Sequence, residues 1–275
     1  MKNTVETFRS AKGKTKLSMV TAYDFTLAAV IEKAGINAVL VGDSLGMVVL
    51  GYENTLSVTM EDMIHHTRAV SRACSNTLVV SDLPFMSYQK GVTDAVTNAG
   101  RLVQEGRAQA VKLEGGAEFV DEIKAMVRAS IPVMGHLGLT PQSVNAFGGF
   151  KVQGKSVKAA QKLLDDARAI QDAGVFSLVL EGIPSMLGAK ITQELDVPTI
   201  GIGAGSECDG QVLVWQDMLG LSPRKPKFAK CYWNAGEAIF NAFQDYANEV
   251  ATKAFPSREF CYSVENEAEI IAQLH

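Results

Sequence analysis

Several short apolar runs in this chain each end in a charged or ionisable residue. The runs AVLVGDS, TLVVSDLP, AVKLEGG, IPVMGHLG and SLVLEGIP end at or beside Asp43, Asp82, Lys112, Glu114, His136 and Glu181. Nearly continuous Val, Ile and Leu residues are typical of buried parallel strands. If these strands share one sheet, their carboxyl ends bring several acids to the same edge. Such a cluster is costly to bury unless a cation or bound protons neutralise it.

Asp43, Asp82 and Glu114 provide carboxylates from three successive predicted strands. Hard oxygen ligands without a nearby Cys or paired His suit Mg²⁺, which binds a few carboxylates and keeps positions for water and substrate oxygens. One such acid alone would more simply cap the following helix or pair with Lys or Arg. The three together, with Lys112 beside Glu114, favour a Mg²⁺ site.

Two further ionisable residues lie at predicted strand ends. His136 is flanked by glycines that allow close backbone approach, and it is either a hydrogen-bonded core histidine or a substrate contact. Glu181 follows an apolar run, a setting that suits a general base. The alternative for Glu181 is an ion pair with a lysine such as Lys112.

Strand alternation predicts where some of these side chains point. In residues 110–114 the Val and Leu share one face, while Lys112 and Glu114 share the other. If the apolar pair faces outer helices, the charged pair points into a barrel near its carboxyl end, where enzymes of this architecture have their active sites. By the same count, Asp43 shares the face of Val41.

Helical periodicity separates the strand-like runs. A face containing Leu27, Val30 and Ile31 predicts a helix that Gly35 ends, and Thr59 is a plausible N-cap for another. Strands are expected near residues 20, 40, 80, 112, 134, 179, 200 and 213, with helices between them. Eight alternating units favour a (β/α)₈ TIM barrel, an α/β fold, in a single domain of residues 1–275.

The last part of the chain is less regular. The segment between Gly203 and Gln211 leaves little room for a helix. Residues 234–254 carry Ile239, Phe240 and Phe243 on one face, which predicts a C-terminal helix that closes the barrel. A basic cluster in the Pro-containing loop before it reads as a solvated turn or, alternatively, as a contact for an anionic substrate tail. The cluster consists of Arg224, Lys225, Lys227 and Lys230.

Composition limits the classes of function. The net charge of −4 gives no general attraction for nucleic acid or acidic membranes. The N-terminus lacks the apolar stretch of a secretory signal, and no run approaches about 18 apolar residues. The four cysteines are widely spaced and form no C-x-x-C pair, so a disulfide framework is not indicated. We therefore expect a soluble, cytoplasmic protein without nucleic-acid or membrane partners.

Longer motifs resemble a known enzyme family. They are VGDSLGMVVLGYENTLSVTMEDMIHHTRAV, DLPFMSYQ, AVKLEGG, PVMGHLGLTPQSV, GGFKVQG and PTIGIGAGSECDGQVLV, and they span about residues 16 to 256. In this order they are similar to the ketopantoate hydroxymethyltransferases, also called 3-methyl-2-oxobutanoate hydroxymethyltransferases. The resemblance fades after residue 256, so the tail at residues 257–275 has no assigned role.

The resemblance implies a fold, a reaction and an assembly. Members of this family are (β/α)₈ barrels that form homo-oligomers, often decamers. They use Mg²⁺ and the cosubstrate 5,10-methylenetetrahydrofolate to convert 3-methyl-2-oxobutanoate into ketopantoate (2-dehydropantoate), for pantothenate and coenzyme A synthesis. No motif identifies the folate site, although the Gly-rich loop at residues 201–205 is a candidate.

The resemblance also implies roles for single residues. Asp43, Asp82 and Glu114 are expected to be the metal-site acids, with Glu114 binding directly or through water. The 2-oxo acid is expected to contact Asp43, Ser44, Asp82 and Lys112, with His136 beside it. Glu181 matches the catalytic base, which would take the C3 proton of the substrate to form a Mg²⁺-stabilised enolate.

Two other functions remain open from the sequence. A Mg²⁺-dependent carbon–carbon lyase or mutase of the phosphoenolpyruvate and isocitrate lyase type would share the barrel and the enolate chemistry, but would act without folate. A noncatalytic barrel that binds a 2-oxo acid would use the same rim without exchanging protons. The presence of Lys112, Glu114 and Glu181 together disfavours this second alternative.

Overall fold

The computed structural model describes residues 2–222 and 226–274, and within them parallel strands close into one barrel. Each strand pairs with the next in chain order, and β8 pairs with β1. The strands are β1 (Leu17–Thr21), β2 (Ala38–Val41), β3 (Leu78–Asp82), β4 (Ala110–Glu114), β5 (Val133–Gly138), β6 (Ser177–Glu181), β7 (Thr199–Ile202) and β8 (Gly210–Leu213). The predicted (β/α)₈ barrel is confirmed, and each strand lies where the sequence predicted one.

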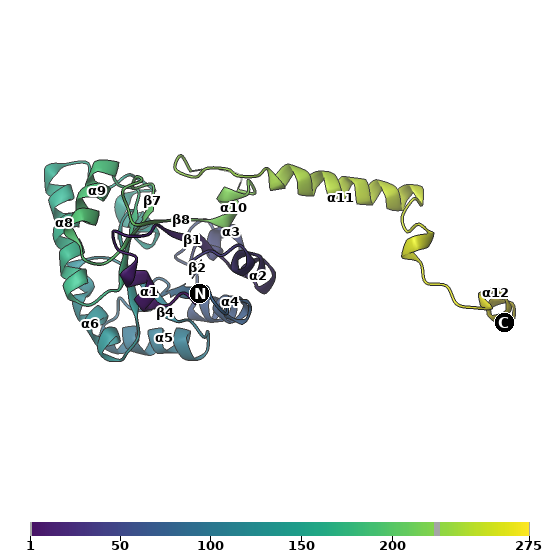
Figure 1. Cartoon of the computed structure of the whole chain (residues 1–275), viewed down its shortest axis with the longest axis horizontal. Coiled ribbons are helices and arrows are strands. Elements are labelled where there is room, and N and C mark those ends of the chain that lie inside the picture. The colour runs from purple at the N-terminus through teal and green to yellow at the C-terminus, as the bar shows by residue number, and fades with distance from the viewer. Residues whose placement is uncertain (1, 223–225, 275) are drawn as a thin grey trace. The chain divides into compact units, whose positions relative to one another are not determined.

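Helices connect the strands and surround the barrel (Figure 1). The longer ones are α2 (Phe25–Lys33), α4 (Met60–Ala73), α5 (Val92–Gln104), α6 (Val120–Arg128), α8 (Val157–Asp172) and α9 (Ser185–Glu194). Short ones are α1 (Val5–Ser10), α3 (Leu45–Val48), α7 (Val144–Phe147), α10 (Trp215–Met218), and the 3₁₀ turns η1 (Ala117–Phe119) and η2 (Pro141–Ser143). No helix in the described part of the chain is long and apolar enough to cross a membrane.

Two of the predicted helix features can be compared with the structure. Thr59 is the N-cap of α4, because its hydroxyl accepts a hydrogen bond from the Asp62 backbone N–H at 3.1 Å. The predicted apolar face of α2 is wrong at one position. Ala28 and Ile31 are buried, whereas Val30 is 59% exposed. The buried face of α2 is therefore rotated away from Val30.

Side chains of each strand alternate between two apolar layers. One layer includes residues of the surrounding helices as well as Val111 and Leu113, so it lies between the strands and the helices. The other includes Val80, Ala110 and Met134 but none of the surrounding longer helices, so it fills the barrel. Full burial of a Val, Leu or Met side chain stabilises the fold by about 1.5–3 kcal/mol. These layers hold the strand ends in place.

The amino-terminal end of the barrel is closed by α1. Phe8 is 1% exposed and belongs to the apolar cluster inside the barrel. Its ring packs edge to face on that of Phe176, with the ring centroids 6.0 Å apart. The open end of the barrel is therefore the one formed by the carboxyl ends of the strands.

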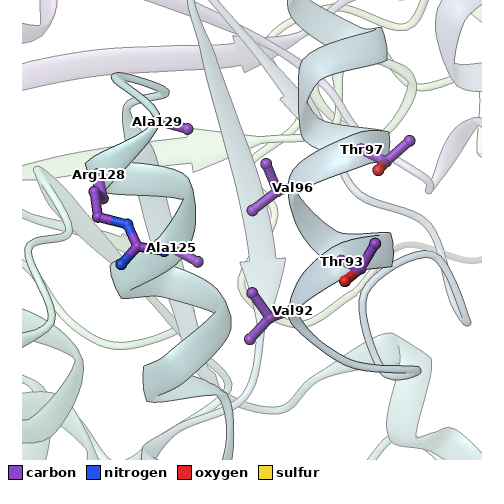
Figure 2. Close-up of a pocket in the computed structure, with 7 residues that line it drawn as sticks. All are labelled: Val92, Thr93, Val96, Thr97, Ala125, Arg128 and Ala129. Carbon is purple, nitrogen blue, oxygen red and sulfur yellow. The ribbon is translucent and has the colours of Figure 1, made fainter.

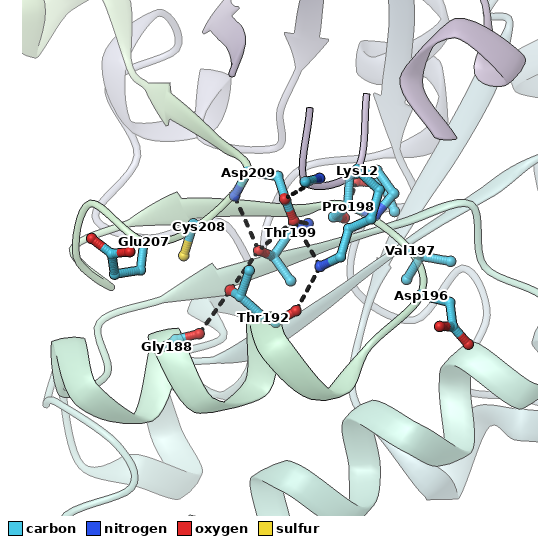
Figure 3. A network of polar contacts seen from close by, with 12 residues as sticks. Lys12, Gly188, Thr192, Asp196, Val197, Pro198, Thr199, Glu207, Cys208 and Asp209 are labelled. Atoms are coloured by element: carbon cyan, nitrogen blue, oxygen red, sulfur yellow. Dashed lines mark hydrogen bonds and ion pairs between the residues drawn. The ribbon is translucent and has the colours of Figure 1, made fainter. Parts of the chain in front are cut away.

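Hydrogen bonds hold together the barrel unit that lacks a helix. As expected, residues 203–209, between β7 and β8, form no helix. Lys12 Nζ donates to Asp209 Oδ2 at 2.9 Å and to the Thr192 carbonyl at 2.6 Å (Figure 3). Asp209 Oδ2 also accepts from the Thr199 backbone N–H at 2.9 Å. This network ties the N-terminal segment, α9 and β7 to the residue before β8.

The chain divides into two compact units, Met1–Met218 with Ser222–Lys230, and Leu219–Leu221 with Cys231–His275. The second unit contains α11 (Ala235–Thr252), η3 (Arg258–Phe260) and α12 (Glu267–Ala272). The C-terminal helix therefore forms where it was predicted. Its role in closing the barrel, and a single domain over residues 1–275, stay predictions. Of the basic cluster, Arg224 and Lys225 lie outside the described residues.

Glu32, near the end of α2, holds the segment that leads into β3. Its carboxylate accepts hydrogen bonds from the backbone N–H groups of Asn76 at 2.9 Å and Thr77 at 3.0 Å. Partial burial favours the neutral acid, but the hydrogen bonds from Thr77 and Asn76 outweigh it and lower the pKa of Glu32 from 4.5 to about 2. The ionised carboxylate is therefore part of the folded structure.

We predict that Glu32→Gln lowers the free energy of unfolding at pH 7 by about 1–2 kcal/mol. Because the folded-state pKa lies below the unfolded one, the ionised form stabilises the protein above pH 4.5, and this stabilisation is lost as the pH falls toward about 2. Urea unfolding of both proteins from pH 7 to pH 2 measures the effect. The difference should shrink on acidification, and Glu53→Gln in an exposed loop should show no such trend. A pH-independent difference would contradict the assignment.

Candidate active site

The barrel strands bring the predicted ionisable side chains to one rim. Asp82, Lys112, His136 and Glu181 each lie two positions after a residue of the interior cluster, so alternation points them into the barrel at its carboxyl end. The strand register places Asp82 beside Lys112 and Glu114 beside His136. Four neighbouring strands, β3 to β6, therefore contribute to one cluster of charges.

Lys112 and His136 lie among the carboxylates. Lys112 Nζ is 3.0 Å from Asp82 Oδ1 and 3.1 Å from His136 Nδ1. The His136 ring lies between two acids, with Nδ1 3.4 Å from Glu114 Oε1 and Nε2 3.3 Å from Glu181 Oε2. The Glu181 side chain is 15% exposed, whereas the other four are 3–4% exposed. Glu181 therefore has the most accessible side chain of these five residues.

Asp43 also lies in this cluster, but strand alternation does not set the direction of its side chain. Strand β2 ends at Val41, which packs in the outer layer, so alternation would point Asp43 toward the helices. Instead the chain turns after β2, and the Asp43 backbone N–H donates to Asp82 Oδ2 at 3.1 Å. The Asp43 carboxylate accepts from Gln142 Nε2 at 2.9 Å. The location at the rim, predicted from the strand end, is confirmed, whereas the predicted shared face with Val41 is wrong.

The pKa values of the three buried acids shift in different directions. Burial raises the pKa of Asp43 well above its ordinary value, and the charges of Asp82 and Glu114 raise it further. Burial also raises the pKa of Asp82, against the opposing charge of Lys112. For Glu114, the hydrogen bond and charge of His136 and the charge of Lys112 outweigh burial and lower the pKa. Burial therefore disfavours the ionised forms of Asp43 and Asp82, whereas the environment of Glu114 favours its ionised form.

The two bases respond to the same charges. Burial alone would lower the pKa of Lys112, but Asp82, Glu114 and Asp43 raise it. Burial and Lys112 oppose protonation of His136, yet the hydrogen bonds to Glu114 and Glu181 raise its pKa to about 9. Lys112 is therefore a cation at neutral pH, and the neighbouring carboxylates favour protonation of His136.

The charges fit a divalent cation. By formal charge, the carboxylates of Asp43, Asp82, Glu114 and Glu181 outnumber the Lys112 ammonium and the His136 ring, so two negative charges remain even when His136 is counted as an imidazolium. In addition, Asp82 Oδ1 receives no well-directed hydrogen bond from the described residues, although Lys112 Nζ is within ion-pair distance. Hard oxygen donors with uncompensated charge suit Mg²⁺.

A ready metal site is nevertheless not formed. Among the residues described, no group of three or more His, Cys, Asp and Glu side chains has an arrangement that could hold a metal ion. The carboxylates of Asp82, Glu114 and Asp43 contact Lys112, His136 and Gln142 instead. A cation would have to displace or share these contacts, and the metal roles of the acids stay predictions.

The capping and core alternatives for these residues are less well supported. The N-cap positions after β2, β3 and β4 are occupied by Ser44, Gly91 and Gly116, not by the acids. The ion-pair partner found for Glu181 is His136 and not Lys112. Ser44, which is partly buried, lies beside Asp43 with its Oγ 2.9 Å from the Tyr23 hydroxyl. The strand-end residues therefore face one another across the rim.

A glycine allows β5 and β6 to meet beside the proposed base. Gly138 has a φ of +98°, a conformation that side chains disfavour, and a Cβ there would lie 2.2 Å from the Glu181 carbonyl oxygen. Gly135 is also close-packed, because a Cβ would lie 2.7 Å from Ile170 Cδ1. The predicted close backbone approach is confirmed at Gly138, whereas at Gly135 the side chain of Ile170 packs against the backbone.

Loop residues that the sequence did not single out complete the cluster. Gln142, in η2, is 6% exposed and bonds to Asp43 through its side chain and to Glu114 through its backbone. Tyr88, in the β3–α5 loop, donates to the Glu114 carbonyl at 2.8 Å. No strand or helix periodicity marks these positions. Tyr88 lies in the motif DLPFMSYQ, and Gln142 lies in PVMGHLGLTPQSV. The family motifs were therefore the only feature of the sequence that pointed to these residues.

A pocket elsewhere on the molecule has different chemistry. It measures about 350 Å³ and lies between α5 and α6 (Figure 2). Its lining consists of Val92, Thr93, Val96, Thr97, Ala125, Arg128 and Ala129. These residues include none of the acids at the rim and a single ionisable side chain. The strand-end cluster, with its opposed charges, is the better candidate for chemistry.

Solved structures with a similar fold include several enzymes. A 2,3-dimethylmalate lyase, a member of the PEP mutase/isocitrate lyase superfamily, matches with a TM-score of 0.60 and 16% identity, covering 95% of this chain and 89% of that one. A phosphonopyruvate hydrolase in complex with oxalate and Mg²⁺ matches with a TM-score of 0.58 and 14% identity, covering 98% and 94%. At these identities the likeness shows a shared fold.

Sequence comparison gives much closer relatives. The 3-methyl-2-oxobutanoate hydroxymethyltransferase of Clostridium novyi (strain NT) is 61% identical over 267 residues, covering 96% of this chain and 97% of the relative. The enzyme of that name from Enterococcus faecalis (strain ATCC 700802 / V583) is 60% identical over 269 residues, covering 97% and 98%. A sequence model of the ketopantoate hydroxymethyltransferases matches residues 2–258. The chain therefore belongs to the ketopantoate hydroxymethyltransferase family.

Proposed function

We propose that this enzyme transfers a hydroxymethyl group to 3-methyl-2-oxobutanoate and forms 2-dehydropantoate (ketopantoate), a step of pantothenate and coenzyme A biosynthesis. The one-carbon unit comes from 5,10-methylenetetrahydrofolate, and water completes the hydroxymethyl group. The names of the close relatives support this reaction. The observation that carries the proposal is the buried cluster of acids with uncompensated charge beside the more exposed Glu181.

We assign Asp43, Asp82 and Glu114 to hold Mg²⁺. When bound, Mg²⁺ would supply Lewis acidity toward the 2-oxo group of the substrate. Asp43, Ser44, Asp82 and Lys112 would contact the 2-oxo acid, with His136 beside it. Because Lys112 is buried and cationic, it can bind the substrate carboxylate or stabilise negative charge that develops on the substrate.

Glu181 has the position expected of a general base. It takes the proton from C3 of the substrate, which leaves an enolate whose negative charge lies near Lys112. His136 Nε2 lies 3.3 Å from Glu181 Oε2, within ion-pair distance of the carboxylate. The nucleophilic C3 then forms a bond to the methylene carbon of the folate as one of the two carbon–nitrogen bonds of that carbon breaks and its nitrogen takes up a proton. Water cleaves the other carbon–nitrogen bond, which releases the hydroxymethylated product and tetrahydrofolate. The folate would approach from the accessible side, where residues 201–205 stay a candidate.

We predict that Glu181→Gln slows exchange of the substrate C3 proton with deuterated water by about 10²- to 10⁴-fold, because the amide cannot accept the proton. NMR of 3-methyl-2-oxobutanoate in D₂O with Mg²⁺ measures the exchange, and omission of Mg²⁺ gives the metal dependence. Substrate binding should change little. Glu207→Gln, on an exposed loop, is the matched control. Exchange at the wild-type rate in Glu181→Gln would eliminate this residue as the base.

The metal assignment gives a separate prediction. Asp43→Asn and Asp82→Asn should each weaken Mg²⁺ binding by at least about tenfold, because each removes a charged oxygen ligand. Isothermal titration with Mg²⁺ measures the dissociation constant directly. Asp217→Asn changes a buried acid of α10 outside the cluster and should leave it unaltered. Unchanged titration of the two site variants would show that the ion binds elsewhere.

The need for folate separates this reaction from that of the lyases and mutases with the same fold. Carbon–carbon bond formation should require added 5,10-methylenetetrahydrofolate, whereas proton exchange should not. Turnover of the 2-oxo acid without folate would favour the lyase or mutase alternative.

We further propose a cytoplasmic homo-oligomer, a decamer as the family resemblance implies. Large apolar side chains on α11 that are 40–69% exposed in the single chain support association. They are Ile239, Phe240, Phe243, Tyr246 and Val250. Sedimentation velocity of the full chain tests this, and a monomer at micromolar concentration would refute it.

A further inference from the structure

Gln142 connects four segments of the rim. It lies in η2 after β5, and its side-chain Nε2 donates to Asp43 Oδ2, after β2, at 2.9 Å. The same nitrogen donates to the Leu83 carbonyl, after β3, at 2.9 Å. The Gln142 backbone N–H donates to Glu114 Oε2, at the end of β4, at 2.9 Å. One buried residue therefore bonds to two of the three proposed metal acids.

The surroundings of the Gln142 amide determine its orientation. The atom facing Asp43 and Leu83 must be the NH₂ group, because a carboxylate and a carbonyl oxygen can only accept. Its Oε1 accepts from Gln89 Nε2 at 3.1 Å and lies 2.9 Å from the Tyr88 hydroxyl, whose single proton also has the Glu114 carbonyl within reach. Reversing the amide would place its oxygen against the Asp43 carboxylate and the Leu83 carbonyl, acceptor against acceptor. These two acceptors therefore fix the orientation of the amide.

The chemical type of this side chain matters. A lysine or arginine at this position would neutralise charge that the acids need to attract a divalent cation, and a glutamate would add a further negative charge to the cluster. A neutral amide donates to the carboxylate without changing the net charge. It also occupies one oxygen, Asp43 Oδ2, and so turns Oδ1 away from Gln142.

We propose that Gln142 is a positioning residue that aims the Asp43 carboxylate at the Mg²⁺ site, while its backbone N–H fixes Glu114. This deepens the proposed function and rests on the metal site assigned there. Gln142 is not placed in contact with the reacting atoms. It acts on the ligand, much as residues bonded to metal-binding side chains orient them and set affinity elsewhere.

The proposal predicts a specific loss on substitution. Gln142→Met has a similar length but no amide, so Asp43 loses its fixed orientation, whereas the backbone bond to Glu114 remains. Mg²⁺ binding should weaken by about 10- to 100-fold. Gln142→Asn keeps an amide that is one methylene too short and should weaken binding in the same direction. It provides the test if Gln142→Met does not fold.

The experiment combines titration, spectroscopy and a double-mutant cycle. Mg²⁺ affinity is measured by calorimetry, and the Mn²⁺ electron paramagnetic resonance spectrum reports the ligand environment. Adding Gln142→Met to Asp43→Asn should cost less than about twofold in affinity, because Gln142 acts through Asp43. The control is Ser87→Ala, in the same set of loops, whose hydroxyl donates to the Pro84 carbonyl at 2.6 Å. It should leave affinity and the Mn²⁺ spectrum unchanged.

The outcomes distinguish this inference from the proposed function. If the wild-type protein binds Mg²⁺ and Asp82→Asn impairs binding, but Gln142→Met and Gln142→Asn bind normally, the positioning role is overturned. It is also overturned if the losses of Gln142→Met and Asp43→Asn multiply, since Gln142 would then act independently of Asp43. If the wild-type protein binds no Mg²⁺, or Asp82→Asn binds it normally, the metal site itself fails.

Discussion

Excess negative charge in a nearly dry rim is the constraint on which the rest of the site depends. Asp43, Asp82 and Glu114 are 3–4% exposed, so bulk water cannot solvate their carboxylates. Their charge has to be balanced by Lys112 and His136, by hydrogen bonds from loops, and by protons or a cation. The need for balance explains why the strand-end residues contact one another. In the proposed function, the same excess charge would hold a divalent cation and, through it, an anionic substrate.

The contacts that stabilise the barrel and the charged cluster lie at different levels along the barrel axis. At the amino-terminal end, Phe8 packs on Phe176 and the Lys12–Asp209 network joins the N-terminal segment to the last strands. The middle is filled by apolar side chains from alternate strand positions. Two positions further along the strands, the same alternation points charged side chains into the barrel. A destabilising cluster can exist at the rim because the apolar layers below and around it hold the strands at a fixed register.

Neighbouring acids acquire different properties although they are of similar chemical type. Burial and like charges raise the pKa of Asp43 and Asp82, so these acids gain most from a cation that replaces their protons. His136 and Lys112 lower the pKa of Glu114, which stays ionised beside them. Glu181 is more exposed and contacts His136 alone among the described charges. These differences in burial and charge fit the proposed division between cation binding by the buried acids and proton transfer by Glu181.

Much of the fold and part of the site could be predicted from the sequence. Apolar runs marked each strand, and period-two alternation correctly pointed Lys112 and Glu114 into the barrel, because strand geometry is local. Asp43 lies at the rim, as its position after a strand predicted, but a turn after β2 and not alternation with Val41 sets its direction. Val30 fitted a helical period but not the buried face. Periodicity shows that a face exists, whereas packing against neighbouring elements selects which residues it contains.

The sequence by itself determined the order of strands and helices, the interior position of the strand-end charges, and, through its motifs, the family. The tertiary structure alone decided which charges meet, that His136 rather than Lys112 is the partner of Glu181, and that Gln142 bonds to both Asp43 and Glu114. The physical reason is the distance along the chain. Gln142 and Asp43 are 99 residues apart, and their contact depends on barrel closure and loop conformation, neither of which leaves a periodic signal in the sequence.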